Sequence, residues 1–168
     1  MERILVDKNG YKQFFDELEK LKKISLKSAT VGNEAYKDAV GDGWHDNFAF
    51  EDSMRESRTI AKKIDKMLEE QSNLKIIEPK KTRDELINIG DVFKIKIEYD
   101  IDDVEEEFVK LTGNYFPNID NNVKEITLNS PIGKAVFQKR INSKTSYFVR
   151  DKEIIIYILE KIQNVIYD

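Results

Sequence analysis

The chain has 168 residues and a mass of 19.7 kDa, which suits one domain of medium size or two small ones. Its formal net charge of −4 argues against a general attraction to nucleic acid, although a local basic stripe is compatible with that sum. The absence of cysteine excludes disulfides, thiolate metal sites and cysteine nucleophiles. No stretch is long and apolar enough for a signal peptide or a membrane span, so we expect a cytoplasmic protein without a membrane partner.

Residues 7 to about 40 follow a helical pattern. Asp7 suits the N-cap, because its carboxylate can accept hydrogen bonds from the N–H groups of the first turn. Residues then recur at alternating steps of four and three, which predicts a coiled-coil seam. The seam shrinks from large to small residues along the helix: Phe14, Leu18, Leu21, Ser25, Ser28, Gly32, Ala35 and Ala39.

A second helical arm is expected from about Asn47 to Leu74. The same spacing selects Phe50, Met54, Ser57, Ala61, Ile64 and Leu68. The two arms predict an antiparallel coiled-coil hairpin that reverses near residues 41–46. Both arms are polar outside one narrow seam, which favours this hairpin over the alternative of two helices in a globular bundle.

The periodicity changes to two after a linker at residues 77–90, centred on Pro79. We expect a charged turn at 100–107 and a short helix with Ser130 as N-cap, Pro131 at its first position and its end near Gln138. The fold class is therefore α+β, with residues 1–76 as the hairpin and residues 91–168 as a small antiparallel sheet domain crossed by one helix. The expected strands are Val92–Tyr99, Phe108–Leu111, Glu125–Leu128, Thr145–Val149 and a buried strand in Glu153–Val165.

The turn between the arms has an unusual composition. Residues 41–47 read Gly-Asp-Gly-Trp-His-Asp-Asn and contain the chain's single Trp and single His. Glycine and asparagine alone can build such a turn, so Asp42, Trp44, His45 and Asp46 call for another explanation. We interpret this tip as a segment that enters the active site of another protein.

A helical hairpin with an acidic tip, followed by a small sheet domain, resembles the bacterial GreA/GreB transcription elongation (transcript-cleavage) factors. The resemblance covers the whole chain. Three stretches carry it: Gly10 followed by Phe14, Leu18, Leu21 and Lys22; the tip from Gly41-Asp42 to Asp46-Asn47; and Asn129-Ser130-Pro131-Ile132-Gly133-Lys134-Ala135. The first stretch is generic, whereas the other two in this order are specific.

The resemblance implies a factor that is not an independent enzyme. Its hairpin enters the secondary channel of a backtracked RNA polymerase, and its tip carboxylates help to hold a second Mg²⁺ beside the polymerase's own metal. The polymerase then cleaves the 3′ end of the nascent RNA. Asp42 and Asp46 are the implied catalytic and metal-binding residues, with Mg²⁺ shared with RNA polymerase and not bound by the isolated protein. The C-terminal domain is implied to be FKBP-like, and we expect a monomer.

The sequence departs from the family at two places. The usual tip has Gly-Asp-Leu, one further residue and then Glu-Asn, whereas here Gly43-Trp44-His45 separate Asp42 from Asp46-Asn47. The turn thus carries one extra residue, and the second acid is shorter by a methylene. The family's usual Gly-Lys and Gly-Asp pairs after the short helix are replaced by Gln138-Lys139 and Asn142-Ser143.

Each tip residue has a structural alternative. Asp46 suits the N-cap of the second helix, and Asp42 suits a plain turn. Histidine is the residue type whose unperturbed pKa lies near neutrality, so His45 is a candidate for proton relay or phosphate contact, or it is simply an exposed loop residue. Trp44 is a candidate for stacking on an RNA base, or it packs on Phe48 or Phe50 and stiffens the turn.

Two further groups are candidate contact surfaces. A basic stripe behind the tip is a candidate RNA-binding surface, or else a solvated face with interleaved acids. The stripe comprises Arg55, Arg58, Lys62 and Lys66. Ser130, Pro131, Ile132 and Gly133 form a helix start, and the resemblance implies that they also dock on the polymerase rim.

The sequence is therefore compatible with three functions. The leading hypothesis is stimulation of transcript cleavage. The altered tip motivates a second, a regulator that occupies the same channel without cleavage. The third is an FKBP-like isomerase or chaperone, which the lack of a dense aromatic pocket in the C-terminal half disfavours.

Overall fold

The computed structural model describes residues 3–38, 48–78, 85–118 and 123–162, with side chains in the helices up to residue 28 and again from residue 51. The chain divides into two compact units. Unit 1 contains residues 14–74, and unit 2 combines residues 3–13 with the chain from Lys75 onwards. The start of the first helix therefore groups with the sheet, a boundary that differs from the expected division at residues 76 and 91.

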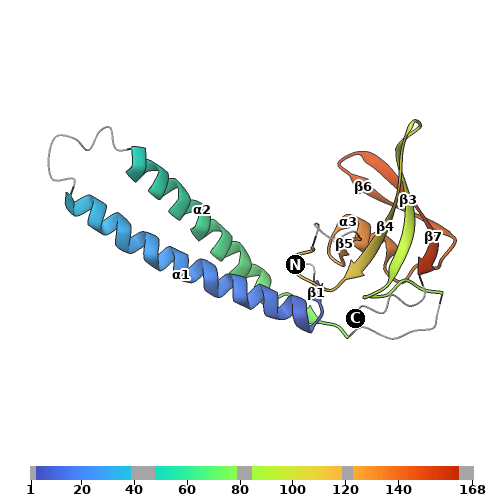
Figure 1. Cartoon of the computed structure of the whole chain (residues 1–168), viewed down its shortest axis with the longest axis horizontal. Helices are drawn as coiled ribbons and strands as arrows, with labels where there is room; N and C mark the ends of the chain where they lie inside the picture. Colours follow the sequence, from blue (N-terminus) through green and yellow to red (C-terminus); the bar gives the residue numbers. More distant parts are fainter. Residues whose placement is uncertain (1–2, 39–47, 79–84, 119–122, 163–168) are drawn as a thin grey trace. The chain divides into compact units, whose positions relative to one another are not determined.

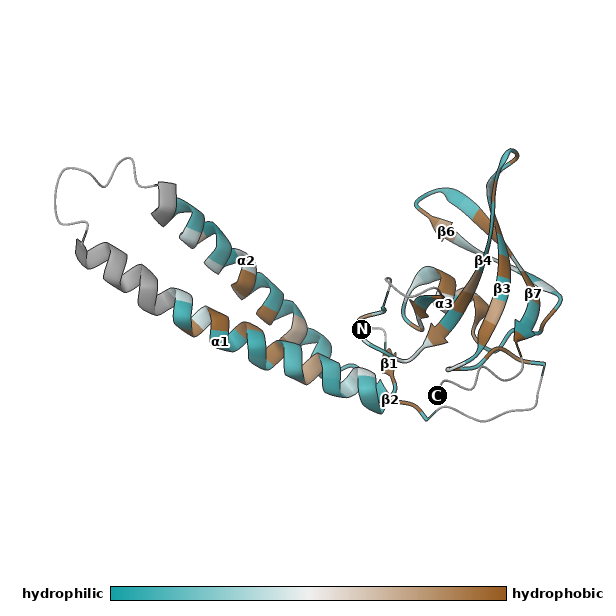
Figure 2. Cartoon of the chain, in the orientation of Figure 1, coloured by the Kyte–Doolittle hydropathy of each residue, from teal (hydrophilic) through white to brown (hydrophobic). Residues whose placement is uncertain are grey.

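Unit 1 consists of two helices, α1 (Lys8–Asp38), which starts in unit 2, and α2 (Phe48–Gln71) (Figure 1). Figure 2 shows that both are mainly hydrophilic along their described lengths, with isolated apolar positions. The helix start at Lys8 confirms Asp7 as N-cap, because its Oδ1 accepts from the Gly10 N–H at 2.7 Å. None of the described helices is long and apolar enough to cross a membrane.

The seam of α1 is confirmed as far as side chains are described. Phe14, Leu18 and Leu21 are buried, and Ser25 and Ser28 are half-buried. Gly32, Ala35, Ala39 and Phe50 lie outside the described side chains. Supercoiling of the two helices stays a prediction.

The predicted seam of α2 is wrong by one position. Met54 and Leu68 are 40% and 43% exposed, and Ala61 is also exposed. The buried face instead runs through Ser53, Ser57, Ile60, Ile64 and Met67. The helix also ends at Gln71 and not at Leu74, because Leu74–Ile76 forms strand β2, which pairs with β1 (Ile4–Val6).

Unit 2 is built on a five-stranded sheet in the order β5-β4-β3-β7-β6. Its strands are β3 (Val92–Asp100), β4 (Asp103–Thr112), β5 (Lys124–Thr127), β6 (Ser143–Val149) and β7 (Lys152–Ile162). The short helix α3 (Pro131–Val136) packs on its inner face. The five expected strands and the helix are thus confirmed in chain order.

The expectation of a purely antiparallel sheet is wrong, because β5 pairs parallel to β4, from Val109↔Lys124 to Thr112↔Thr127. A parallel pair cannot be joined by a tight hairpin turn, so β4 and β5 are not joined by one. The charged turn is also shorter than expected. β4 already starts at Asp103, because its acids have basic partners on the sheet: Glu106 lies 2.8 Å from Lys94, and Glu107 lies 2.7 Å from Lys124.

Alternate residues of the two central strands supply the core of unit 2. Phe93, Ile95 and Ile97 of β3 and Ile156 and Ile158 of β7 are fully buried. Ile87 and Ile89 belong to the same core, and Leu86 forms a bridge with Arg140. The C-terminal end of the expected linker is therefore part of the folded unit; residues 79–84 lie outside the described chain.

At the two places after α3 where the sequence departs from the family's usual pattern, the first residue has a left-handed backbone conformation. Gln138 has φ 58° and Asn142 has φ 59°, a conformation that glycine adopts without steric cost. The Gln138 N–H donates to the Ile87 carbonyl at 2.8 Å, which holds the turn in place. Two positions at which the resemblance leads us to expect glycine thus hold Gln138 and Asn142 in a conformation that favours glycine.

We predict that Gln138→Gly stabilises unit 2 by about 0.5 to 1 kcal/mol. Relief of the left-handed strain outweighs the larger entropy that glycine loses on folding. Lys139→Gly, at the next residue with ordinary φ, is the matched control and should destabilise by a similar amount. Urea unfolding measures both, and equal signs for the two variants would contradict the argument.

Candidate functional site

The predicted tip connects the two helices of unit 1. α1 ends at Asp38 and α2 begins at Phe48, so the segment that carries Asp42, Trp44, His45 and Asp46 joins two helical arms as expected. These four residues lie outside the described residues. Whether the two carboxylates can reach one ion stays a prediction.

The basic stripe lies on the exposed surface of α2. Arg55, Arg58 and Lys62 line a shallow hollow together with Met54, whose exposure follows from the shifted seam. Arg55 lies 3.9 Å from Asp52, and Lys66, one turn further along, lies 3.7 Å from Glu70. The side chains of Arg55 and Lys66 are highly exposed, so these ion pairs hold them only weakly. Both side chains are therefore available to phosphates.

The motif at residues 130–133 has a complete structural role. The Ser130 Oγ accepts from the Gly133 N–H at 3.0 Å and donates to the Thr127 carbonyl at 2.7 Å, so it caps α3 and ties it to the end of β5. Pro131 occupies the first turn. Gly133 is buried against the same carbonyl: a Cβ on it would lie 1.9 Å from the Thr127 oxygen.

Only part of this motif is available to a partner. Pro131 is exposed, whereas Ser130 and Ile132 are half-buried and Gly133 is buried. Ile132 packs against the core of unit 2. A docking role therefore falls on Pro131 and on the outer atoms of Ser130 and Ile132, and it stays a prediction.

Asn129, which precedes the motif, has a role that the sequence reasoning missed. Its Oδ1 accepts from the Leu5 N–H and its Nδ2 donates to the Leu5 carbonyl, both at 2.9 Å. The side chain thus pairs with β1 in the way that a neighbouring strand would. The Asn129 amide thus satisfies both the N–H and the C=O of a residue that is 124 positions away in the chain. Nothing in the sequence around Asn129 predicts this pairing.

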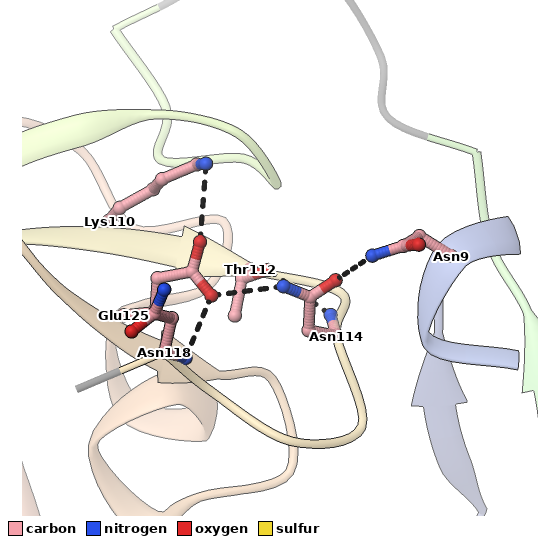
Figure 3. A network of polar contacts seen from close by, with 6 residues as sticks. All are labelled: Asn9, Lys110, Thr112, Asn114, Asn118 and Glu125. Carbon is pink, nitrogen blue, oxygen red and sulfur yellow. Dashed lines mark hydrogen bonds and ion pairs between the residues drawn. The ribbon is translucent and has the colours of Figure 1, made fainter. Parts of the chain in front are cut away.

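A polar network links β5 to the first turn of α1 (Figure 3). Glu125 lies at its centre with a side chain that is 7% exposed. Its Oε2 accepts from the Asn114 amide at 2.9 Å and from the Asn118 N–H at 3.1 Å, and its Oε1 lies 3.3 Å from Lys110 Nζ. Asn114 in turn accepts from the Asn9 amide at 2.7 Å.

The chemistry of Glu125 fixes the direction of these bonds. A carboxylate only accepts, so Asn114 must present its NH₂ group to Glu125 and its oxygen to Asn9. Burial by itself raises the pKa of Glu125, but the hydrogen bonds from Asn118, Asn114 and Lys110 outweigh it, and the pKa lies below its ordinary value. The network therefore requires an ionised Glu125.

Gly10 and Gly113 allow the first turn of α1 to lie against the loop after β4. A Cβ on Gly10 would lie 2.1 Å from the Gly113 carbonyl oxygen, and the Asp7 N–H donates to that oxygen at 2.9 Å. One turn on, the Gln13 Oε1 accepts from the Tyr115 N–H at 3.1 Å. Gly10, at the start of the first resemblance stretch, thus has a packing reason that its helical context did not reveal.

Comparisons with known proteins give full-length sequence matches. The chain is 26% identical to a transcription elongation factor GreA of Prosthecochloris aestuarii, over 95% of this chain and 96% of that protein. It is 25% identical to a GreA of Chlorobium phaeobacteroides over the same shares. No family model matches.

Solved structures also match the chain along most of its length. The transcription factor Gfh1 has 20% identity and a TM-score of 0.44 over 96% of this chain and 99% of that chain. GreA factor homolog 1 of Thermus thermophilus has 20% identity and a TM-score of 0.42 over 96% of this chain and 100% of that chain. It is the full-length sequence matches that support the GreA/GreB-like elongation factor family for this chain.

Proposed function

We propose that this protein is a Gre-family transcription elongation factor that binds RNA polymerase through its secondary channel and stimulates the polymerase's own cleavage of backtracked transcripts. The observation that carries the proposal is the similarity over 95% of the chain to proteins named transcription elongation factor GreA. The protein acts as a monomer and supplies groups to the polymerase site without being an enzyme by itself.

The tip supplies the chemistry in this proposal. Asp42 and Asp46 offer the oxygen ligands that Mg²⁺ prefers, and one or two carboxylates suffice because the polymerase provides the remaining ligands. When bound, the ion supplies positive charge that activates the attacking water.

The two contact surfaces position the tip. Arg55, Arg58, Lys62 and Lys66 contact the phosphates of the extruded 3′ segment of RNA in a sequence-independent way. Pro131, with the outer atoms of Ser130 and Ile132, docks on the polymerase. Gly133 contributes by packing α3 and not by direct contact.

We predict that Asp42→Ala lowers the rate of transcript cleavage on the order of 100-fold, because a ligand that stabilises charge in the transition state is lost. The measurement is the length of labelled RNA in a stalled, backtracked complex after addition of protein and Mg²⁺. Glu19→Gln is the matched control, since Glu19 is an exposed acid of α1 whose one ion pair among the described residues is with Lys23, at 3.7 Å. Unchanged cleavage by Asp42→Ala would refute the proposed role.

A second candidate function follows from the altered tip. The extra residue in Gly43-Trp44-His45 and the shorter acid Asp46 favour a regulator that occupies the channel without completing the metal site. The same experiment separates the two, because such a regulator changes the rate of elongation but yields no shortened RNA.

A further inference from the structure

β6 forms an open edge of the sheet in unit 2. It is the last strand in the sheet order, and no other described strand pairs with its outer side (Figure 1). A two-residue turn joins it to β7, and Val149 faces Lys152 across that turn. The residue pair that flanks a two-residue hairpin turn is hydrogen-bonded. Along an antiparallel ladder, hydrogen-bonded pairs alternate with pairs that are not hydrogen-bonded. The N–H and C=O groups of Lys144, Ser146 and Phe148 therefore point away from β7, towards the open edge.

The two faces of β6 differ in their contacts. On the inner face, the Thr145 hydroxyl donates to the Ala135 carbonyl at 3.1 Å, and Tyr147 packs against the core. On the outer face, Lys144, Ser146 and Phe148 alternate with them, and Phe148 is 65% exposed. The inner face of β6 is thus bound to the core of unit 2. Its outer edge and the Phe148 side chain beside that edge are available to a partner.

The segment around β6 has the opposite charge to the whole chain. Residues 139–152 contain five cations and one acid, Asp151, which gives a net charge of +4 against −4 for the chain. Four of the cations are exposed and form no ion pair within the described parts of the chain: Lys139, Arg140, Lys144 and Arg150. The fifth, Lys152, pairs with Asp100 at 3.0 Å. An acidic partner would therefore be attracted to this edge.

We propose that β6 binds an extended acidic segment of another protein, which adds to the sheet as a sixth strand. The backbone groups of Lys144, Ser146 and Phe148 supply the hydrogen bonds, and an apolar side chain of the partner covers Phe148. A second copy of this chain is disfavoured as occupant because two edges of charge +4 would repel each other. RNA would use the positive charge but not the alternating N–H and C=O groups.

The test uses a labelled heptapeptide of alternating valine and glutamate, with binding to the full chain measured by fluorescence anisotropy. Ser146→Pro removes an outward N–H without removing a bond to β7, so it should weaken binding at least ~10-fold. Ser146→Ala keeps the N–H and should bind as the wild type does. Lys144→Glu should also weaken binding, through charge.

A second measurement needs no variant. Two versions of the peptide carry N-methyl groups, one on the valines and the other on the glutamates. Both keep the charge of the peptide, but each has lost the N–H groups along one of its two edges. The version that lacks the N–H groups facing β6 should not bind the wild-type chain. Equal binding of all peptides, or of folded Ser146→Pro, would overturn the proposal. Displacement of the peptide by an oligouridylate, or dimerisation through β6 in sedimentation, would overturn it in favour of RNA or of a second copy.

Discussion

Replacing Gly133 with alanine is expected to lower the free energy of unfolding of unit 2 by roughly 3 kcal/mol, at the upper end of overpacking effects. The added Cβ would lie 1.9 Å from the Thr127 carbonyl oxygen. That oxygen cannot simply move away, because it accepts from the Ser130 N–H at 3.1 Å and from the Ser130 hydroxyl at 2.7 Å. Helix propensity alone predicts the opposite sign, since alanine is favoured over glycine by about 1 kcal/mol.

The control is Lys134→Ala, the neighbouring exposed residue of the same short helix. It should change stability by no more than about 0.5 kcal/mol. Urea unfolding gives the total effect, and hydrogen exchange of the β3 amides reports on unit 2 specifically. If Gly133→Ala were as stable as the wild type, the close approach of α3 to β5 would not be a determinant of the fold.

Local chemistry explains which parts of the fold could be predicted. Asp7 and Ser130 cap their helices with short-range hydrogen bonds, and Pro131 follows its cap directly, so each signal lies within a few residues. The alternation in β3 has the same character, because one face is buried against the core and the other carries charged residues. The sequence signals of these features can therefore be recognised without knowledge of the rest of the chain.

The register of α2 shows where local patterns become ambiguous. The predicted and the observed stripes both satisfy the four-three spacing and share Ser57 and Ile64. They differ in whether Met54 and Leu68 or Ile60 and Met67 are buried. The sequence of one helix cannot decide between stripes that lie side by side, because the choice depends on the partner helix.

Long-range pairings account for the rest. The β1–β2 pair and the link from Asn129 to Leu5 join segments that are far apart in the chain, and the parallel pairing of β5 skips over the loop after β4. Glu125 is similar: it is one glutamate among many until the fold places Asn114 and Lys110 beside it. The chemistry of the tip is implied only by the resemblance, and the residues that carry it lie outside the described chain.

Glu125→Ala is expected to destabilise unit 2 by about 2 kcal/mol, because it removes a buried acceptor from the partly buried hydrogen bonds that hold the loop after β4. The Asn118 N–H and the Asn114 amide lose their hydrogen bonds to Glu125, and Asn114 no longer has a fixed orientation towards Asn9. Glu106→Ala is the matched control. Glu106 also pairs with a lysine, Lys94 at 2.8 Å, but it is 46% exposed, so its loss should cost less than about 1 kcal/mol.

The pH dependence gives a second readout of the same network. Because the pKa of Glu125 is lowered in the folded state, the unfolded state binds its proton more readily. The stabilisation is therefore complete above the ordinary value of 4.5 and is lost as the pH falls from there through the lowered pKa. Glu98, Asp100 and Glu106 also have lowered pKa values, so the wild type must be compared with Glu125→Gln, which retains those three groups.

Glutamine keeps the shape of the side chain and one accepting oxygen but does not titrate. The difference in free energy of unfolding between the wild type and Glu125→Gln should thus shrink as the pH is lowered below 4.5. Urea unfolding at a series of pH values measures this difference. A difference that stays constant with pH would mean that shape, and not the charge of Glu125, holds the loop after β4 against the first turn of α1.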